Sequence, residues 1–133
     1  MAEDSLVSSM SGSRHTPLIV EGAALLKSLD DAGIPIHAAY WIFDPEARDW
    51  KYILSSPLVT SEGPLKMYRR LQTYLANSDL KLQDIAVVTM HDPLLVLLRS
   101  AIHTSATDIA GIRFTANTIK NIFIDDAYIY RVA

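Results

Sequence analysis

The sequence of 133 residues contains no cysteine. Disulfide scaffolds, thiolate zinc sites and cysteine nucleophiles are therefore excluded. No apolar run reaches the roughly 18 residues that a transmembrane helix needs, so no membrane association is expected. The chain also lacks an excess of basic residues, because 15 acidic and 12 basic side chains give a formal net charge of −3. This balance creates no general attraction to nucleic acid, and a nucleic-acid partner is not expected.

Residues 1–15 lack the features of a secretory signal, which needs a basic start and a continuous apolar segment. Glu3 and Asp4 place negative charge at the start, and five of these fifteen residues are serine. We expect a flexible tail over residues 1–15 and a single domain over residues 16–133. The absence of both a signal and cysteine favours a cytoplasmic location.

Half of the residues are hydrophobic, and their spacing predicts the secondary structure. Leucines at helical spacing follow Thr16-Pro17, a typical helix start, and Gly33 supplies a left-handed stop. Residues 34–43 and 50–54 flank a turn and predict a β-hairpin with two apolar faces, inside a sheet that is covered on both sides. A symmetrical turn places the following side chains on one face: His37, Ala39, Trp41, Phe43, Trp50, Tyr52 and Leu54.

The middle of the chain contains two further helices and a strand. Residues 55–64 are expected to form a loop, and Pro64 begins the second helix. Residues 85–90 form a short, wholly apolar strand of the kind found at the centre of parallel sheets. Residues 94–102 are predicted as a third helix that is apolar nearly all round, and is therefore either deeply buried or covered by a partner. The stripe expected on the second helix comprises Leu65, Tyr68, Leu71 and Leu75.

Residues 112–119 and 122–132 are predicted as a closing hairpin that is joined by Lys120-Asn121. Its register leaves Asp125 as the one charge on an apolar face. The complete order is α-β-β-α-β-α-β-β, which predicts a mixed α/β domain with a five-stranded mixed sheet and helices packed on it. The strand at residues 85–90 runs parallel to a neighbour. The core face expected for the hairpin comprises Ile112, Phe114, Ala116, Phe123, Ala127 and Ile129.

The first candidate site lies at the end of the strand at residues 85–90. Thr89, His91 and Asp92 occupy the position where open α/β sheets bind ligands. His91 has the chemistry of a general acid or base near neutral pH, and Asp92 or Thr89 would orient it. The alternative interpretation is that Asp92 is only a helix cap and His91 an exposed loop residue.

The second candidate is the loop at residues 56–64 with Arg69 and Arg70 on the following helix. Hydroxyl groups and backbone amides ahead of a helix, with arginines one or two turns on, have the chemistry to bind phosphate. The segment has one glycine and is not a P-loop. A solvated arginine pair on an outward helix face explains the same residues.

The third candidate is the acidic turn of Asp44, Glu46 and Asp49, followed by Lys51, a pattern seen in metal-dependent nucleases. Acidic residues are common in turns, and the basic cleft of a nuclease is missing. The histidines at positions 15, 37, 91 and 103 lack the i, i+4 spacing of a zinc site. No metal and no cofactor are therefore expected.

The fourth candidate is the polar face of the closing hairpin. Arg113 and Asp126 are expected within ion-pair reach of each other across the strands, next to Tyr128. If no helix covers this face, tyrosine and arginine side chains there form a binding surface. An entirely structural role is the alternative. The binding residues predicted on this face are Arg113, Asn117, Asp126, Tyr128 and Tyr130.

These patterns favour a small non-enzymatic protein-binding or regulatory module that forms a homodimer, or binds another protein, through the third helix and the closing hairpin. Leu97 and Tyr130 are the residues expected at the contact. The alternative is a small hydrolase or phosphoryl-handling enzyme with its site around His91 and Asp92. The sequence leaves open whether any reaction is catalysed.

Overall fold

The computed structural model describes residues 15–76 and 78–133. A five-stranded sheet has the order β3-β2-β1-β5-β4 and is mixed, because only the pair β2–β3 is parallel. The mixed α/β class and the order of the main elements are thus confirmed. The tail expected over residues 1–15 lies outside the described residues except for His15, which begins the first helix. The elements are α2 His15–Asp31, β1 Ala38–Asp44, β2 Asp49–Ser55, α3 Pro57–Glu62, α4 Pro64–Leu75, η1 Leu82–Asp84, β3 Ile85–Val88, α5 Pro93–Arg99, β4 Ile112–Ile119 and β5 Ile122–Val132.

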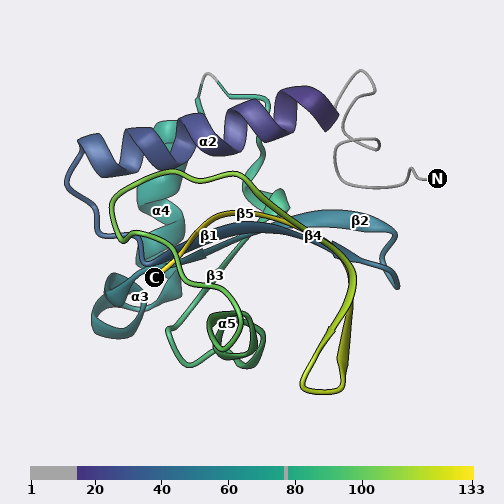
Figure 1. The fold of residues 1–133 in the computed structure, drawn as a ribbon. Helices are drawn as coiled ribbons and strands as arrows, with labels where there is room; N and C mark the ends of the chain where they lie inside the picture. Colours follow the sequence, from purple (N-terminus) through teal and green to yellow (C-terminus); the bar gives the residue numbers. More distant parts are fainter. Residues whose placement is uncertain (1–14, 77) are drawn as a thin grey trace.

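Helices cover both faces of the sheet (Figure 1). Side chains of α2, α3 and α4 pack on one face, where Trp41 and Tyr52 are at the centre of the larger core. The side chains of α5 pack on the opposite face against Tyr40 and Ile129. Within the described residues no helix is long and apolar enough to cross a membrane.

The hairpin of β1 and β2 has the register expected from the sequence. Trp41 lies opposite Tyr52, and Phe43 lies opposite Trp50. The rings of Trp41 and Tyr52 stack with their centroids 4.9 Å apart. Because β1 and β2 are covered on both faces, the two-sided apolar pattern reflects burial in the middle of the sheet.

The strand β3 is parallel to β2, as expected, but its position at the centre of the sheet is a wrong prediction. It is an edge strand, with β2 as its single neighbour. The Tyr68 hydroxyl accepts a hydrogen bond from the Val87 backbone N–H at 3.1 Å, which satisfies one group on this edge. The apolar composition of β3 therefore reflects packing against the covering helices rather than a second strand.

Residues 55–64 are not a simple loop, because α3 occupies much of this segment. The hydroxyl of Ser56 accepts a hydrogen bond from the Leu58 N–H at 3.1 Å and caps the helix, and Val59 is buried. The helix α4 begins at Pro64 as expected, but Leu65 is 63% exposed while Met67 is buried. The buried stripe is thus shifted by two residues at the start of the helix.

The helix α5 ends at Arg99, three residues before the expected end at residue 102. Leu95 and Leu98 are fully buried, whereas Val96 on the other side is 48% exposed. One side of this apolar helix therefore belongs to the domain core, and the other side is exposed to solvent.

The hairpin of β4 and β5 has the expected register, with Arg113 opposite Tyr128 and Ile119 opposite Ile122. Lys120 and Asn121 both have positive φ, of 49° and 71°, which is typical of a two-residue hairpin turn. The prediction that Phe123 lies on the core face is wrong, since Phe123 is 60% exposed and Ile124 is buried instead.

The alternation of side chains is broken next to Ala116. This residue has φ of 46° and lies between the pairs Thr115–Asp126 and Asn117–Ile124. An irregular residue in one strand increases the local twist and redirects the side chains beyond it. The end of the hairpin therefore projects away from the sheet, as Figure 1 shows.

Candidate functional site

The end of the β4–β5 hairpin borders an apolar cavity, which we call the tip cavity. Its volume is about 430 Å³, within the range typical of ligand-binding clefts. Leu94 at the start of α5 contributes one wall, and Ile42 and Ile53 of the sheet contribute another. The remaining lining residues are Phe43, Asp44, Pro45, Lys51, Ile122, Phe123, Ile124 and Asp125.

Two large apolar side chains at the rim of the tip cavity face solvent. Ile122 is 52% exposed and Phe123 is 60% exposed. Isolated exposed apolar residues are ordinary, but adjacent ones next to an apolar cavity are typical of interaction sites. Sequence reasoning assigned Phe123 to the core, and the unexplained charge of Asp125 was the one signal that this strand departs from simple alternation.

The tip cavity also holds three charged groups. Asp44 accepts hydrogen bonds from the backbone N–H groups of Glu46 and Ala47, and the Lys51 ammonium donates to the Gln83 carbonyl at 2.9 Å. The carboxylate of Asp125 is half-buried and has no hydrogen bond or ion pair with residues 15–76 or 78–133. An incoming cation would therefore find an accessible acceptor there.

At the candidate site at the end of β3, the side chains of Thr89 and Asp92 form hydrogen bonds with nearby backbone N–H groups. The carboxylate of Asp92 accepts from the Leu95 N–H at 3.2 Å and caps α5, while the Thr89 hydroxyl accepts from the His91 N–H at 3.3 Å. His91 is exposed. None of the three cavities described in this section is lined by these three residues. Asp92 thus acts as the cap that the sequence offered as the alternative.

A buried tyrosine lies on the same side of the sheet. The hydroxyl of Tyr40 has no hydrogen-bond partner in the described part of the chain. Burial raises the pKa of this hydroxyl well above its ordinary value, and the negative charge of Asp92 raises the pKa further. The side chain is therefore a neutral phenol at physiological pH.

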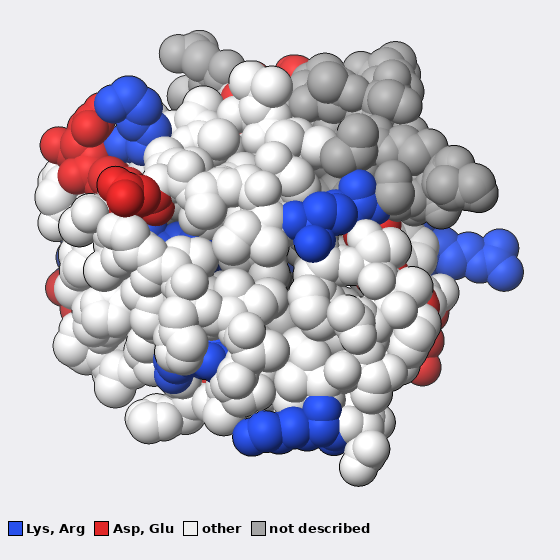
Figure 2. Space-filling view, viewed as in Figure 1, with Lys and Arg blue, Asp and Glu red and all other residues white. Residues whose placement is uncertain are grey.

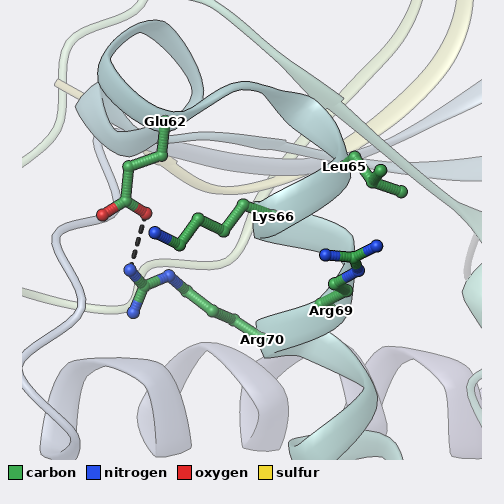
Figure 3. Close-up of a pocket in the computed structure, with 5 residues that line it drawn as sticks. All are labelled: Glu62, Leu65, Lys66, Arg69 and Arg70. Carbon is green, nitrogen blue, oxygen red and sulfur yellow. Dashed lines mark hydrogen bonds and ion pairs between the residues drawn. The ribbon is translucent and has the colours of Figure 1, made fainter.

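Arg69 and Arg70 line a second cavity of about 580 Å³ on the outer surface of α4 (Figure 3). The Arg70 guanidinium pairs with the Glu62 carboxylate at 2.6 Å, which lowers the pKa of Glu62. Figure 3 shows Lys66 and Arg70 on the side of Glu62, and Arg69 on the other side with Leu65. A compact phosphate site would require the two arginines to converge on one point, and they do not.

The polar face of the closing hairpin is built around an ion pair. Arg113 donates to both carboxylate oxygens of Asp126, each at 2.6 Å, and the Thr115 hydroxyl donates to the same carboxylate at 3.0 Å. Asp126 is buried, with a side-chain exposure of 6%. These contacts satisfy the carboxylate within the domain, as the structural alternative predicts. Asn117 lies apart from this network and accepts a hydrogen bond from the Thr118 N–H.

A tyrosine binding surface on this face requires that no helix covers it. Tyr130 does not meet this requirement, because α2 lies over its side chain. The Tyr130 hydroxyl donates to the Ile19 carbonyl of α2 at 2.6 Å and accepts from the Trp41 indole at 3.1 Å. Gly22 allows this approach, since a Cβ there would lie 2.6 Å from the Tyr130 hydroxyl. Tyr128 is half-buried and packs against the same core.

A third cavity, of about 450 Å³, contains the buried Arg131. Its guanidinium donates to both oxygens of Asp30 at 3.0 and 2.8 Å, and to the carbonyls of Ile36 and Asp108, each at 3.1 Å. With four donor contacts made inside the chain, Arg131 joins α2 to the loops at the sheet end rather than offering a ligand site.

The acidic turn gives no metal centre in the described residues, where no group of three or more potential ligands is found. Charged side chains on the surface seen in Figure 2 are interspersed with large uncharged areas. No family model, curated protein or solved structure matches the chain.

Proposed function

We propose that the protein is a protein-binding module that associates with a second copy of itself through the tip cavity. The observation that carries this proposal is the exposed Phe123 beside an apolar cavity of about 430 Å³. Aromatic side chains that fill well-packed pockets are among the residues that contribute most to interface energies. The exposed side of α5 adds further apolar surface near the start of the same helix that contributes Leu94.

A second copy is a suitable occupant because the surface is self-complementary. A projecting phenyl group and a cavity that accepts one lie on the same patch, which is what a two-fold contact requires. The charges of the patch are also self-complementary. The exposed Lys120 in the turn has a potential acceptor in the half-buried Asp125 of the other copy. Each copy would contribute one phenyl group and one lysine to the partner.

The energy of this contact is dominated by apolar burial. Complete burial of one phenylalanine side chain contributes about 1.5–3 kcal/mol, and a two-fold contact buries two. A carboxylate in place of each phenyl group would remove this gain and place two negative charges in an apolar cavity that already contains Asp125. Substitution of Phe123 is therefore the sharpest perturbation.

Sedimentation equilibrium of the wild-type chain, Phe123→Asp and Leu65→Asp tests the proposal. We expect about twice the monomer mass of 14.8 kDa for the wild type, and the monomer mass for Phe123→Asp. Leu65 is the matched control, because it is 63% exposed and lies on the opposite side of the sheet. A monomeric wild type at high concentration, or equal loss of association in both variants, contradicts the proposal.

Substitutions at Leu97 and Tyr130 are unsuitable for this experiment. Leu97 packs partly against the core, and Tyr130 is 2% exposed with two hydrogen bonds from its hydroxyl. Charged residues at either position would unfold part of the domain, so a loss of association would not report on the interface. Val96, which is 48% exposed on α5, is the appropriate helix position.

A further inference from the structure

A second surface of the molecule has a different chemistry and lies on the helix α4. Lys66, Arg69 and Arg70 project from its outer side, and we call these three residues the basic ridge. Among the described residues, Glu62 is the one acidic side chain that lines the cavity between them. The basic ridge and Glu62 together therefore carry a charge of +2 on a chain whose formal net charge is −3.

The three basic side chains of the ridge differ in whether they form an ion pair within the chain. Arg70 is paired with Glu62 at 2.6 Å, and its Nε atom is buried with no partner in the described residues. Lys66 and Arg69 form no ion pair with any carboxylate of residues 15–76 or 78–133. Lys66 acts on the nearby Glu62 only through its charge, so Lys66 and Arg69 both keep N–H donors for an external anion. The two side chains extend to opposite sides of α4 in Figure 3.

An apolar depression adjoins the basic ridge. Leu65 lines both cavities and is 63% exposed. The depression has a volume of about 580 Å³, and Tyr68 and Leu82 form its apolar wall beside the edge strand β3. The exposed Leu65 would be shielded from water by an apolar group that enters this depression.

We propose that the basic ridge and this depression together bind an acidic polypeptide segment that carries an apolar side chain. An extended chain can place carboxylates at Lys66 and Arg69 separately while its apolar residue contacts Leu65. A compact phosphate fits less well, because the ionised carboxylate of Glu62 lies beside the ends of the Lys66 and Arg70 side chains and repels a concentrated negative charge. This site lies on the side of the sheet opposite α5 and does not depend on self-association.

The test uses a fluorescent peptide of alternating glutamate and leucine, with a peptide of alternating glutamine and leucine as its uncharged counterpart. Anisotropy titration of the full chain is expected to show binding of the acidic peptide that weakens as salt is added. Removal of two surface ion pairs by Lys66→Gln with Arg69→Gln is expected to weaken binding about tenfold. Leu65→Ser is expected to weaken it as well.

Lys27→Gln is the control for loss of surface charge away from the basic ridge, because it removes one exposed lysine charge from α2. The control is expected to bind the acidic peptide as the wild type does, and so is the Phe123→Asp variant, since the site is separate from the tip cavity. Circular dichroism of each variant checks that it is folded.

Several results would overturn the proposal. These are absence of binding, equal binding of the glutamine peptide, and equal weakening by Lys27→Gln. Two further probes address other anions. Saturable binding of inorganic phosphate at the same residues, or binding of phosphatidylserine vesicles without binding of the peptide, would assign the basic ridge to those ligands instead.

Discussion

Two buried tyrosines show how different the consequences of one hydroxyl group can be. Tyr40 and Tyr130 are on opposite faces of the sheet, and both are almost fully buried. The Tyr130 hydroxyl makes two hydrogen bonds, to Trp41 and Ile19, whereas the Tyr40 hydroxyl makes none in the described residues. A buried polar group without a partner retains its desolvation cost, so the two hydroxyls have opposite effects on stability.

We therefore predict opposite outcomes for the two phenylalanine substitutions. Tyr130→Phe leaves the buried Trp41 indole N–H unpaired, removes the hydrogen bond to the Ile19 carbonyl, and lowers the free energy of unfolding by about 1–3 kcal/mol. Tyr40→Phe removes an unsatisfied hydroxyl and leaves the free energy of unfolding unchanged or raises it by up to about 1 kcal/mol. Urea denaturation at fixed protein concentration measures both. A clear loss of stability in Tyr40→Phe would show that its hydroxyl has a partner.

At the scale of elements, the closing hairpin depends on its turn. Asn121 has φ of 71°, a left-handed conformation that asparagine adopts more readily than most residues. Asn121→Ala is expected to lower the free energy of unfolding by about 1 kcal/mol, because the left-handed conformation is unfavourable for alanine.

Asn117→Ala is the matched control, since Asn117 is exposed on β4 of the same hairpin and is not among the residues with positive φ. Thermal or urea denaturation of both variants gives the comparison. An equal or larger effect of Asn117→Ala would contradict the account of the turn.

Sequence patterns predicted those elements in which local signals and tertiary packing agree. The helix stop at Gly33, the cap at Asp92 and both hairpin registers follow from turn and cap chemistry, which acts over a few residues. The edge position of β3 was not predictable, because apolar composition reports burial but not which neighbour supplies it.

The candidate site was less accessible to sequence reasoning. The exposure of Phe123 depends on the irregular backbone at Ala116, for which alanine gives no signal. The tip cavity is formed by residues from β1, β2, α5 and β5, so its existence depends on the complete tertiary structure. In contrast, the cluster of bases on α4 follows directly from helical spacing, although its relation to Leu65 does not.

At the scale of the whole molecule, the buried tyrosines determine the response to alkaline pH. Burial raises the pKa of Tyr40, Tyr52 and Tyr130 well above the ordinary value of 10.0. The folded state therefore keeps protons that the unfolded state releases above pH 10, and the free energy of unfolding falls as the pH rises through that range. Below pH 10 these groups are protonated in both states and have no effect on the pH dependence.

We predict that alkaline unfolding and ionisation of these three side chains occur together. In an alkaline titration, the tyrosinate absorbance of three side chains should appear only as the far-ultraviolet circular dichroism signal of the folded protein is lost. Ionisation of all tyrosines while the native circular dichroism persists would contradict the burial of these hydroxyl groups.

Association through the tip cavity is the central claim, and the absence of cysteine allows a direct measurement. In a two-fold contact with its axis at the ends of the two β4–β5 hairpins, a single cysteine in place of Ile122, at the rim of the cavity, would lie close to its equivalent. Under mild oxidation we predict rapid formation of a disulfide-linked dimer by Ile122→Cys, and little by Leu65→Cys, whose residue is similarly exposed on the opposite side of the sheet. Equal cross-linking of the two variants, or none in Ile122→Cys, would contradict the claim.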